Sequence, residues 1–425
     1  MLPYSSLSFW EFDSFKGPWD FVIIGAGVTG LNAAIELKKQ KPTLRVLVLE
    51  AKNTGAVASS RSAGFLCLGS PSEQWAQMDA LGETAWMHWT AAKWAGIQRM
   101  LRLLGTKSMK YSRVKAYEIV PLPGAFRRSD VDIDRVVHDM KLLNERMQKV
   151  ASQPLPFRSE RKRKKVAEIP LPFPYYGNTL SLGTKQGWGM DATMALPIAF
   201  EGQVHPMILL HSLKRYATNL GIHILQGFPV ASLGPVDRDL QEIYFDNQLI
   251  IKSKNIILCT NALTNNLVPQ PQVIPQRGQI LVSAPIPGGL PNRLKGNFHG
   301  DAGYLYYRNL GNDRLLLGGA RNLDFQKEQS DQWAENPAIT DQLTQYAHRV
   351  LGMKPEDLVW EQAWSGTMGF TATGVPHLQD MGGQRWLVAG MNGMGMALGP
   401  EMGRRVARWA LAPGNIDPQK AGLLP

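Results

Sequence analysis

The segment DFVIIGAGVTGLNAAIELKKQ, residues 20–40, constrains the fold of this chain more than any other. An apolar run at 21–24 is followed by Gly25, Gly27 and Gly30 and then by apolar residues at helical spacing. In such a strand, turn and helix, the first glycine makes the tight turn, the second lets a pyrophosphate approach the backbone, and the third lets the helix pack on the strand. The free N–H groups at the helix N-terminus attract the anion. The sequence therefore predicts a dinucleotide-binding unit.

The chain has a carboxylate at the position where such a unit usually carries the acidic residue that binds a ribose. The apolar run 46–49 ends in Glu50. A carboxylate there repels the 2′-phosphate of NADP but leaves FAD and NAD open. The next segment, AKNTGAVASSRSAGFLCLGS, is rich in small residues and can run beside an extended cofactor. Its Arg61 can pair with a phosphate or lie near a flavin, although a surface loop is an alternative for this residue.

A second glycine turn lies near the C-terminus, in QRWLVAGMNGMGMALGPEMGRRVARWAL. We expect a strand at 386–389, a turn at Gly390, Gly393 and Gly395, and a helix from about Pro400. The backbone N–H groups of such a turn can stabilise negative charge on a reduced flavin as well as on a phosphate.

Composition limits the class of protein. A chain of 425 residues predicts two domains, or one with a large insertion. Cys67 and Cys259 have no spacing typical of a disulfide framework or a zinc site, so we expect no metal and a reduced, cytoplasmic setting. We find neither a signal peptide nor a run long enough to span a bilayer. The net charge of +11 arises partly from the basic run at 158–165, which indicates a solvated segment rather than a nucleic-acid groove.

Four motifs resemble the FAD-dependent oxidoreductases that include D-amino acid oxidase, glycine oxidase and sarcosine oxidase. They are VIIGAGVTGLNAAIEL with VLVLE, ASSRSAG, CTNALTNNLVPQPQVIPQRGQILVS, and WSGTMGFTATGVPHL with LVAGMNGMGMALGPEMG. The stretch YLYYRNLGNDRLLLGGA is most similar to the gamma-glutamylputrescine oxidase-like branch. The resemblance implies an α/β fold: a Rossmann-like FAD-binding domain with a discontinuous α+β substrate domain on a mixed β-sheet.

The resemblance also implies domain boundaries and cofactor contacts. The FAD-binding domain would comprise 17–80, 196–275 and 365–412, and the substrate domain 81–195 and 276–364, with terminal extensions at 1–16 and 413–425. The residues that would contact FAD are Gly25, Gly27, Val28, Thr29, Gly30, Glu50, Ala51, Ser60, Arg61, Ser62, Val230, Thr260, Ala262, Gly390, Asn392, Gly393, Met394, Gly395 and Met396.

The chain departs from the family pattern at several positions. Ser365 stands where sarcosine oxidases carry a flavin-tethering cysteine, and VASSRSAG lacks the tethering histidine of other relatives, so we expect non-covalent FAD. Positions that match the oxygen-activating lysines of sarcosine oxidases read as Leu316 or Leu317 and Met396. Ser62 replaces the usual asparagine. Oxygen and another electron carrier both remain open as the acceptor.

The substrate side offers fewer signals. We expect strands in GQILVSAPI, AGYLYYRNL and DRLLLGGAR to cover the flavin, with the pocket at the domain interface. Arg308 and Arg321 are the candidate partners of a substrate carboxylate, since a guanidinium matches two oxygens, and either could instead be a surface cation. Tyr306 and Tyr307 point to opposite sheet faces, so at most one lines the pocket, and Tyr306 is our candidate. Trp86 and Trp89 are more typical of a helix core than of an amine-binding cage.

These observations predict an FAD flavoprotein that oxidises the C–N bond of a small amine or amino acid to an imine, which water hydrolyses. In that chemistry the protein orients and desolvates the substrate, and the cofactor takes the hydride. The alternative is a flavin-bearing accessory protein that docks through the basic 158–165 segment and turns over little amine. An NAD dehydrogenase is disfavoured by the second glycine turn.

Overall fold

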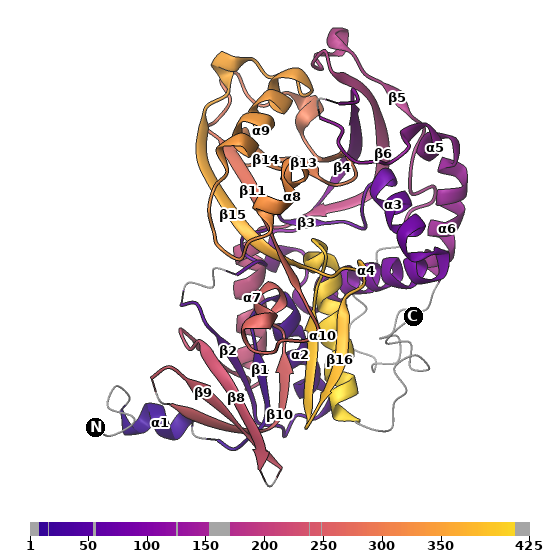
Figure 1. Cartoon of the computed structure of the whole chain (residues 1–425). Coiled ribbons are helices and arrows are strands. Elements are labelled where there is room, and N and C mark those ends of the chain that lie inside the picture. Colours follow the sequence, from indigo (N-terminus) through magenta and orange to yellow (C-terminus); the bar gives the residue numbers. More distant parts are fainter. Residues whose placement is uncertain are drawn as a thin grey trace.

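The computed structural model describes residues 8–15, 17–53, 57–124, 126–152, 171–237, 239–247 and 249–412. The basic segment 158–165 lies outside these residues, as does the C-terminal extension from 413. Two sheets are stacked end to end, with helices beside each of them (Figure 1).

The first sheet contains the predicted dinucleotide-binding unit. Its central strands β10, β1, β2 and β7 are parallel, as buried strands joined by helical crossovers must be, and β17 continues them on the other side. Antiparallel β16 and the β8–β9 hairpin complete it. Its strands are β1 (Trp19–Ile24), β2 (Val46–Glu50), β7 (His223–Gln226), β8 (Val230–Asp237), β9 (Leu240–Phe245), β10 (Ile250–Leu258), β16 (His377–Gly382) and β17 (Arg385–Ala389).

The second sheet is mixed. Strands β12 and β4 pair in parallel, and the other strand pairs of this sheet are antiparallel. This confirms the expected fold class. Its strands are β3 (Phe65–Leu66), β4 (Ser112–Pro121), β5 (Leu180–Ser181), β6 (Ala192–Gln203), β11 (Ile274–Ser283), β12 (Asn297–Gly300), β13 (Leu305–Leu310), β14 (Arg314–Gly319) and β15 (Trp360–Phe370). Strands β6 and β15 run through the predicted boundaries at 195/196 and 364/365, and the division into domains stays a prediction.

Ten α-helices are described. α2 follows the first glycine turn and packs against α7 and α10, while α4 also packs against α10 where the two sheets meet (Figure 1). Trp86 on α4 is buried in the core, as expected, whereas Trp89 is buried but also lines the cavity described below. The helices are α1 (Phe9–Phe15), α2 (Val28–Gln40), α3 (Pro71–Leu81), α4 (Glu83–Leu104), α5 (Ile133–His138), α6 (Met140–Ser152), α7 (Pro206–Asn219), α8 (Phe325–Glu328), α9 (Pro337–Arg349) and α10 (Gly395–Leu411).

The last helix corrects one expectation. We expected it to begin at about Pro400, but α10 begins at Gly395 and contains Pro400 in its second turn. The helix therefore starts directly at the second glycine turn. The backbone N–H groups of that turn form its N-terminus.

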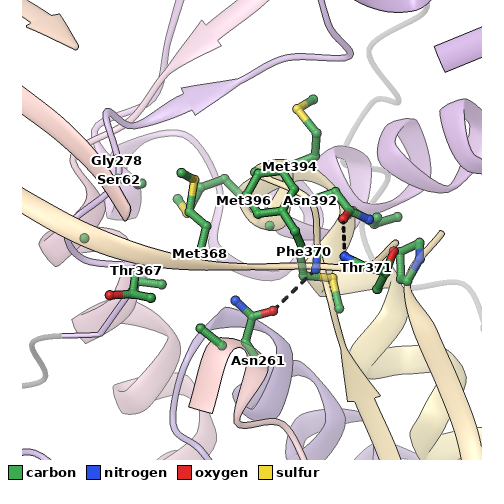
Figure 2. Close-up of a pocket in the computed structure, with 18 of the residues that line it drawn as sticks. Ser62, Asn261, Gly278, Thr367, Met368, Phe370, Thr371, Asn392, Met394 and Met396 are labelled. Carbon is green, nitrogen blue, oxygen red and sulfur yellow. Dashed lines mark hydrogen bonds between the residues drawn. The ribbon is translucent and has the colours of Figure 1, made fainter. Parts of the chain in front are cut away.

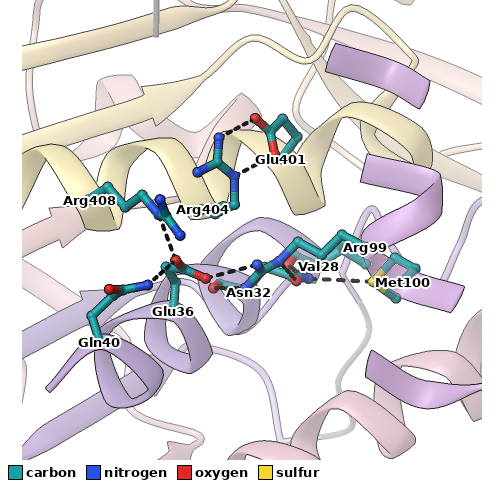
Figure 3. A network of polar contacts seen from close by, with 9 residues as sticks. All are labelled: Val28, Asn32, Glu36, Gln40, Arg99, Met100, Glu401, Arg404 and Arg408. Carbon is teal, nitrogen blue, oxygen red and sulfur yellow. Dashed lines mark hydrogen bonds and ion pairs between the residues drawn. The ribbon is translucent and has the colours of Figure 1, made fainter. Parts of the chain in front are cut away.

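A buried ionic network joins α2, α4 and α10 (Figure 3). Glu36 on α2 accepts from Arg99 of α4 and from Arg408 of α10, each at 2.8 Å. Arg99 Nε also donates to Asn32 Oδ1 at 2.9 Å. Nearer the start of α10, Glu401 forms an ion pair with Arg404 at 2.6 Å. The network thus fixes the helix that carries the first glycine turn to the helix that carries the second.

Candidate functional site

One cavity of about 1500 Å³ runs from the first glycine turn to the second sheet. A site for a single small molecule usually has about 300–1,000 Å³, so this cavity has room for an extended cofactor and a second molecule. Its wall includes most of the residues expected to contact FAD: Gly25, Gly27, Val28, Thr29, Glu50, Ala51, Arg61, Ser62, Val230, Thr260, Ala262, Asn392, Gly393, Met394, Gly395 and Met396.

At the first glycine turn, the backbone leaves no room for side chains. Gly25 has a φ of +111°, and a Cβ there would lie 2.5 Å from the Cys259 carbonyl oxygen. A Cβ on Gly30 would lie 1.9 Å from the Gly25 carbonyl oxygen. Gly30 itself does not line the cavity, so its contribution is the close packing of α2 on the turn. The turn therefore needs glycine at both positions.

Replacing Gly30 by alanine should therefore weaken cofactor binding without touching the cofactor. The methyl group must displace the Gly25 carbonyl, at a cost of about 1–3 kcal/mol, typical of overpacking. We expect FAD affinity, measured by fluorescence titration of the apoprotein, to fall at least tenfold. Gly311→Ala, where a Cβ would meet nothing within 4 Å, is the control. Equal FAD affinity in both variants would contradict this account of the turn.

Two backbone N–H groups hold Glu50 in place at the cavity wall. Its side chain ends β2, is 6% exposed and lines the cavity. Oε2 accepts from the Ala26 backbone N–H at 3.0 Å and Oε1 from that of Lys52 at 3.1 Å. These bonds fix the carboxylate beside the glycine turn, with lone pairs left for two hydroxyl groups.

The Arg61 segment lies across the cavity against β15. Arg61 Nε donates to the Ser365 carbonyl at 2.5 Å, and its guanidinium carbon lies 4.4 Å from the Trp333 ring centroid. Trp364 Nε1 donates to the Arg61 carbonyl at 3.0 Å. Ser60 does not line the cavity, and its hydroxyl instead closes a turn with Val57. Arg61 thus has a defined position at the wall, which favours the cofactor interpretation over a surface loop.

Two asparagines shape the second glycine turn (Figure 2). Asn392, with a φ of +50°, accepts from the Thr371 N–H at 2.9 Å. Asn261 accepts from the Gly390 N–H at 3.0 Å, so Gly390 supports the turn without lining the cavity. Our predicted set did not include Asn261, although it lies in the motif CTNALT. The turn presents the N-terminus of α10 to the cavity, next to the apolar side chains of Met368 and Phe370 on β15 (Figure 2).

The far end of the cavity holds a guanidinium among aromatic rings. Arg321, which begins a short 3₁₀ helix after β14, lies 4.3 Å from the Phe370 ring centroid, 4.9 Å from that of Tyr304 and 5.2 Å from that of Phe325. Nη1 donates a long hydrogen bond, 3.4 Å, to Gln276 Oε1, which leaves donor capacity for a ligand. Arg321 is half-buried and burial lowers the pKa of its guanidinium, so a carboxylate bound here would meet a charge that is less screened than one on the open surface.

Tyr306 lines the same end, and burial raises the pKa of its phenol to about 12, so it is a neutral hydrogen-bond donor. Tyr307, on the opposite sheet face, stacks on Phe298 with ring centroids 4.4 Å apart and is fully buried. As expected, the two tyrosines lie on opposite sheet faces, and only Tyr306 of the pair lines the cavity.

Arg308 corrects another expectation, because it does not line the cavity. It shares a face with Tyr306 but lies two residues further along β13. Its Nη1 donates to the carbonyls of Gly64 at 3.0 Å and Val204 at 3.1 Å. Burial lowers the pKa of Arg308 to about 10, and the guanidinium stays charged at neutral pH. Arg308 therefore joins two chain segments and is no longer a candidate for substrate binding.

Our predicted site did not include a cluster of polar side chains that lies beside Tyr306. Glu73, Lys93, Cys67 and His299 all line the cavity, and His299 Nε2 lies 2.7 Å from Glu201 Oε1. The ligand atoms of Cys67, Glu201 and His299 lie within 4.8 Å of one another. Two ligands of one zinc ion would lie about 3.3 Å apart, given bonds of about 2.0 Å, so the closer His299–Glu201 contact is a hydrogen bond.

None of the helices that the structure describes is long and apolar enough to cross a membrane. No curated protein sequence matches this chain. Among solved structures, glycine oxidase from Geobacillus kaustophilus has a TM-score of 0.69 at 15% identity, covering 94% of this chain and 96% of its own. L-proline dehydrogenase from P. horikoshii has a TM-score of 0.67 at 15% identity, and the match covers 94% of this chain and 95% of its own.

A third structure, L-alpha-glycerophosphate oxidase from Mycoplasma pneumoniae with FAD bound, has a TM-score of 0.65 at 14% identity and covers 92% of this chain and 95% of its own. At these identities the three structures establish the fold alone. The sequence itself matches the family described as FAD dependent oxidoreductase over residues 20–128 and 185–409, which is more than half of the chain. This chain therefore belongs to the FAD-dependent oxidoreductase family, and FAD is its cofactor.

Proposed function

We propose that this enzyme oxidises the C–N bond of a small amine that also carries a carboxylate, such as an amino acid. The observation that carries the proposal is Arg321, whose guanidinium faces the cavity from within a wall of three aromatic rings. A planar guanidinium matches the two oxygens of a carboxylate, and a desolvated one binds it more strongly than an exposed one. When bound, FAD supplies the hydride acceptor.

The residues of the chain would orient the substrate. Arg321 would hold the carboxylate, and Tyr306 would donate a hydrogen bond beside it. The apolar side chains Met368 and Phe370 would keep water away from the reacting carbon. This arrangement is consistent with the similar structures of glycine oxidase and L-proline dehydrogenase, which are named for amino acid substrates. L-alpha-glycerophosphate oxidase shows that the same fold can serve an alcohol, so the bond oxidised must be tested.

Several finer points of the proposal come from the sequence. We expect non-covalent FAD, a cytoplasmic location, no nucleic-acid partner and a place in the gamma-glutamylputrescine oxidase-like branch. Leu316, Leu317 and Met396 supply no cation for oxygen activation at the positions where relatives use lysine, so a dehydrogenase with another electron carrier is an alternative to an oxidase. The accessory-protein alternative depends on residues 158–165, which lie outside the described part of the chain.

Anaerobic reduction of the bound FAD tests the proposal. D- and L-amino acids, N-methylated amino acids, polyamines and 2-hydroxy acids would be added in turn while the flavin absorbance is recorded. Bleaching by one amino acid class is expected, and reoxidation by air would then distinguish an oxidase from a dehydrogenase. Bleaching by hydroxy acids alone would overturn the C–N assignment. No bleaching, with salt-sensitive binding of an anionic partner, would favour the accessory protein.

A further inference from the structure

A cluster of charged side chains is buried beside the cavity. His299 of β12, Glu118 of β4 and Glu201 of β6 are each at most 4% exposed, and Lys93 of α4 is 2% exposed. Glu73 of α3 adds a third carboxyl and lines the cavity, as His299 and Lys93 do. Charges at such depth are costly, and the packing of helices and sheet does not require them.

Within this cluster, His299 has the geometry of an oriented base. Its Nε2 lies 2.7 Å from Glu201 Oε1, and Glu201 Oε2 accepts from Asn297 Nδ2 at 2.9 Å. Because the carboxylate engages Nε2, Nδ1 is the nitrogen left for a ligand, and it makes no hydrogen bond to another described residue. A carboxylate that fixes the orientation of an imidazole beside a reacting group is a recurring arrangement for proton transfer.

The strand register brings His299 next to the proposed substrate site. His299 on β12 is paired directly with Tyr306 on β13, so the two side chains are neighbours on one sheet face. The Phe65 ring contacts both, with centroids 5.4 Å from His299 and 6.1 Å from Tyr306. His299 therefore lies in the same part of the cavity as Tyr306.

We propose that His299 accepts, at Nδ1, the proton that a substrate ammonium must lose before its C–N bond is oxidised, and that Glu201 is its positioning residue. This inference rests on the proposed function. One N–H bond of the ammonium breaks, its electron pair remains on nitrogen as the lone pair, and the proton joins Nδ1. The amine can then release a hydride from its carbon and form the C=N bond. The proton on His299 returns to water after the product leaves.

The surrounding charges suit this transfer. Burial alone would lower the pKa of His299, but Glu201, and more distantly Glu73 and Glu118, outweigh it and raise the pKa to about 9. Cys67 also faces the imidazole, and burial raises the pKa of its thiol, so it stays neutral. Lys93 lies near Glu73, with its Nζ bonded to the Leu68 carbonyl at 2.7 Å. An acceptor with a pKa near 9 is close to an aliphatic ammonium, whose pKa is about 10. Proton transfer is favoured when the two pKa values match.

His299→Gln tests the role of the acceptor. In the native protein, we expect the rate of anaerobic FAD reduction by a saturating amine to rise about tenfold per pH unit up to about pH 9 and then level off. The variant should reduce FAD at least 100-fold more slowly at pH 9. His211→Gln, at an exposed position on α7, is the control. An unchanged rate and pH profile in His299→Gln would overturn the inference and leave the proposed function standing.

Glu201→Gln distinguishes an acceptor from a structural residue. Glutamine keeps the shape of the side chain but removes the charge that raises the pKa of His299. We expect the rising limb of the plot of FAD reduction rate against pH to move by at least one pH unit to lower pH. The titration of the amine itself should be unaffected. A limb that stays in place would count against Glu201 as the positioning residue.

An NMR titration of histidine gives a readout that needs no substrate. The imidazole signal absent from His299→Gln identifies His299, and it should titrate near pH 9 in the native FAD-loaded protein and lower in Glu201→Gln. Titration near its ordinary value of 6.5 in both would overturn the inference. If the NMR result holds but no amine reduces the FAD, the proposed function fails instead.

Discussion

Replacing Glu36 by glutamine should lower the free energy of unfolding by about 3–5 kcal/mol, the usual result of removing one partner from a buried ion pair. Glu36 is fully buried and accepts from both Arg99 and Arg408 at 2.8 Å (Figure 3). Glutamine fills the same volume but leaves Arg99, 5% exposed, without its counter-charge. The loss should exceed that from any surface substitution, because water cannot solvate the remaining cation.

Urea denaturation, with and without bound FAD, measures this effect, since FAD adds its own stabilisation. Asp79→Asn is the matched control, because it breaks an ion pair with Arg135 that is about half exposed on both sides. Such a pair contributes about 0–1 kcal/mol. Equal losses in the two variants would show that the buried network does not stabilise the helices as proposed.

The same network predicts a pH dependence. Burial alone would raise the pKa of Glu36, but Arg99 and Arg408 outweigh it and hold the pKa below its usual 4.5. A carboxyl with a lower pKa in the folded state contributes its full stability above about pH 4.5 and loses it as the pH falls through the folded value. The stability difference between native protein and Glu36→Gln should therefore shrink below pH 4.5. A constant difference down to pH 3 would contradict the ionised pair.

The sequence predicted the residues at the glycine-turn end of the cavity better than those at its far end. The glycines at 25, 27 and 30, the strand before them and Glu50 act through local geometry, so their spacing was sufficient. The start of α10 was misplaced because proline favours the first turn of a helix, whereas Pro400 lies in the second. A preference of that kind does not identify the turn in which the residue lies.

The substrate end depends on contacts between distant segments. Strand alternation placed Tyr306 and Arg308 on one face but could not show how far along β13 the cavity extends. His299 and Glu201 are 98 residues apart and meet only because β12 and β6 both flank β4. Lys93 offered one signal, since a lysine in the apolar run TAAKWAG is unusual for a helix core.

Replacing Arg321 by methionine should abolish the preference of the site for carboxylate ligands. Charge-assisted hydrogen bonds contribute about 1.5–3 kcal/mol each, so loss of a two-pronged contact should raise the Kd of a carboxylate ligand at least 100-fold. Methionine keeps the apolar contacts with Phe370 and Tyr304, so FAD content should be unchanged. Arg321→Lys keeps the charge but not the planar fork, so its Kd for a carboxylate ligand should lie between those of the native protein and Arg321→Met.

Perturbation of the FAD spectrum by a simple aliphatic carboxylate gives the Kd directly, and a neutral amine without a carboxylate provides the contrast. Arg113→Met, an exposed arginine on β4, is the control for loss of positive charge. In Arg321→Met, carboxylate affinity should fall while affinity for the neutral amine is kept. If both affinities fall together, Arg321 supports the cavity wall rather than binding the substrate. If neither falls, the carboxylate lies elsewhere, and the amino acid assignment loses its main structural support, although amine oxidation would still be possible.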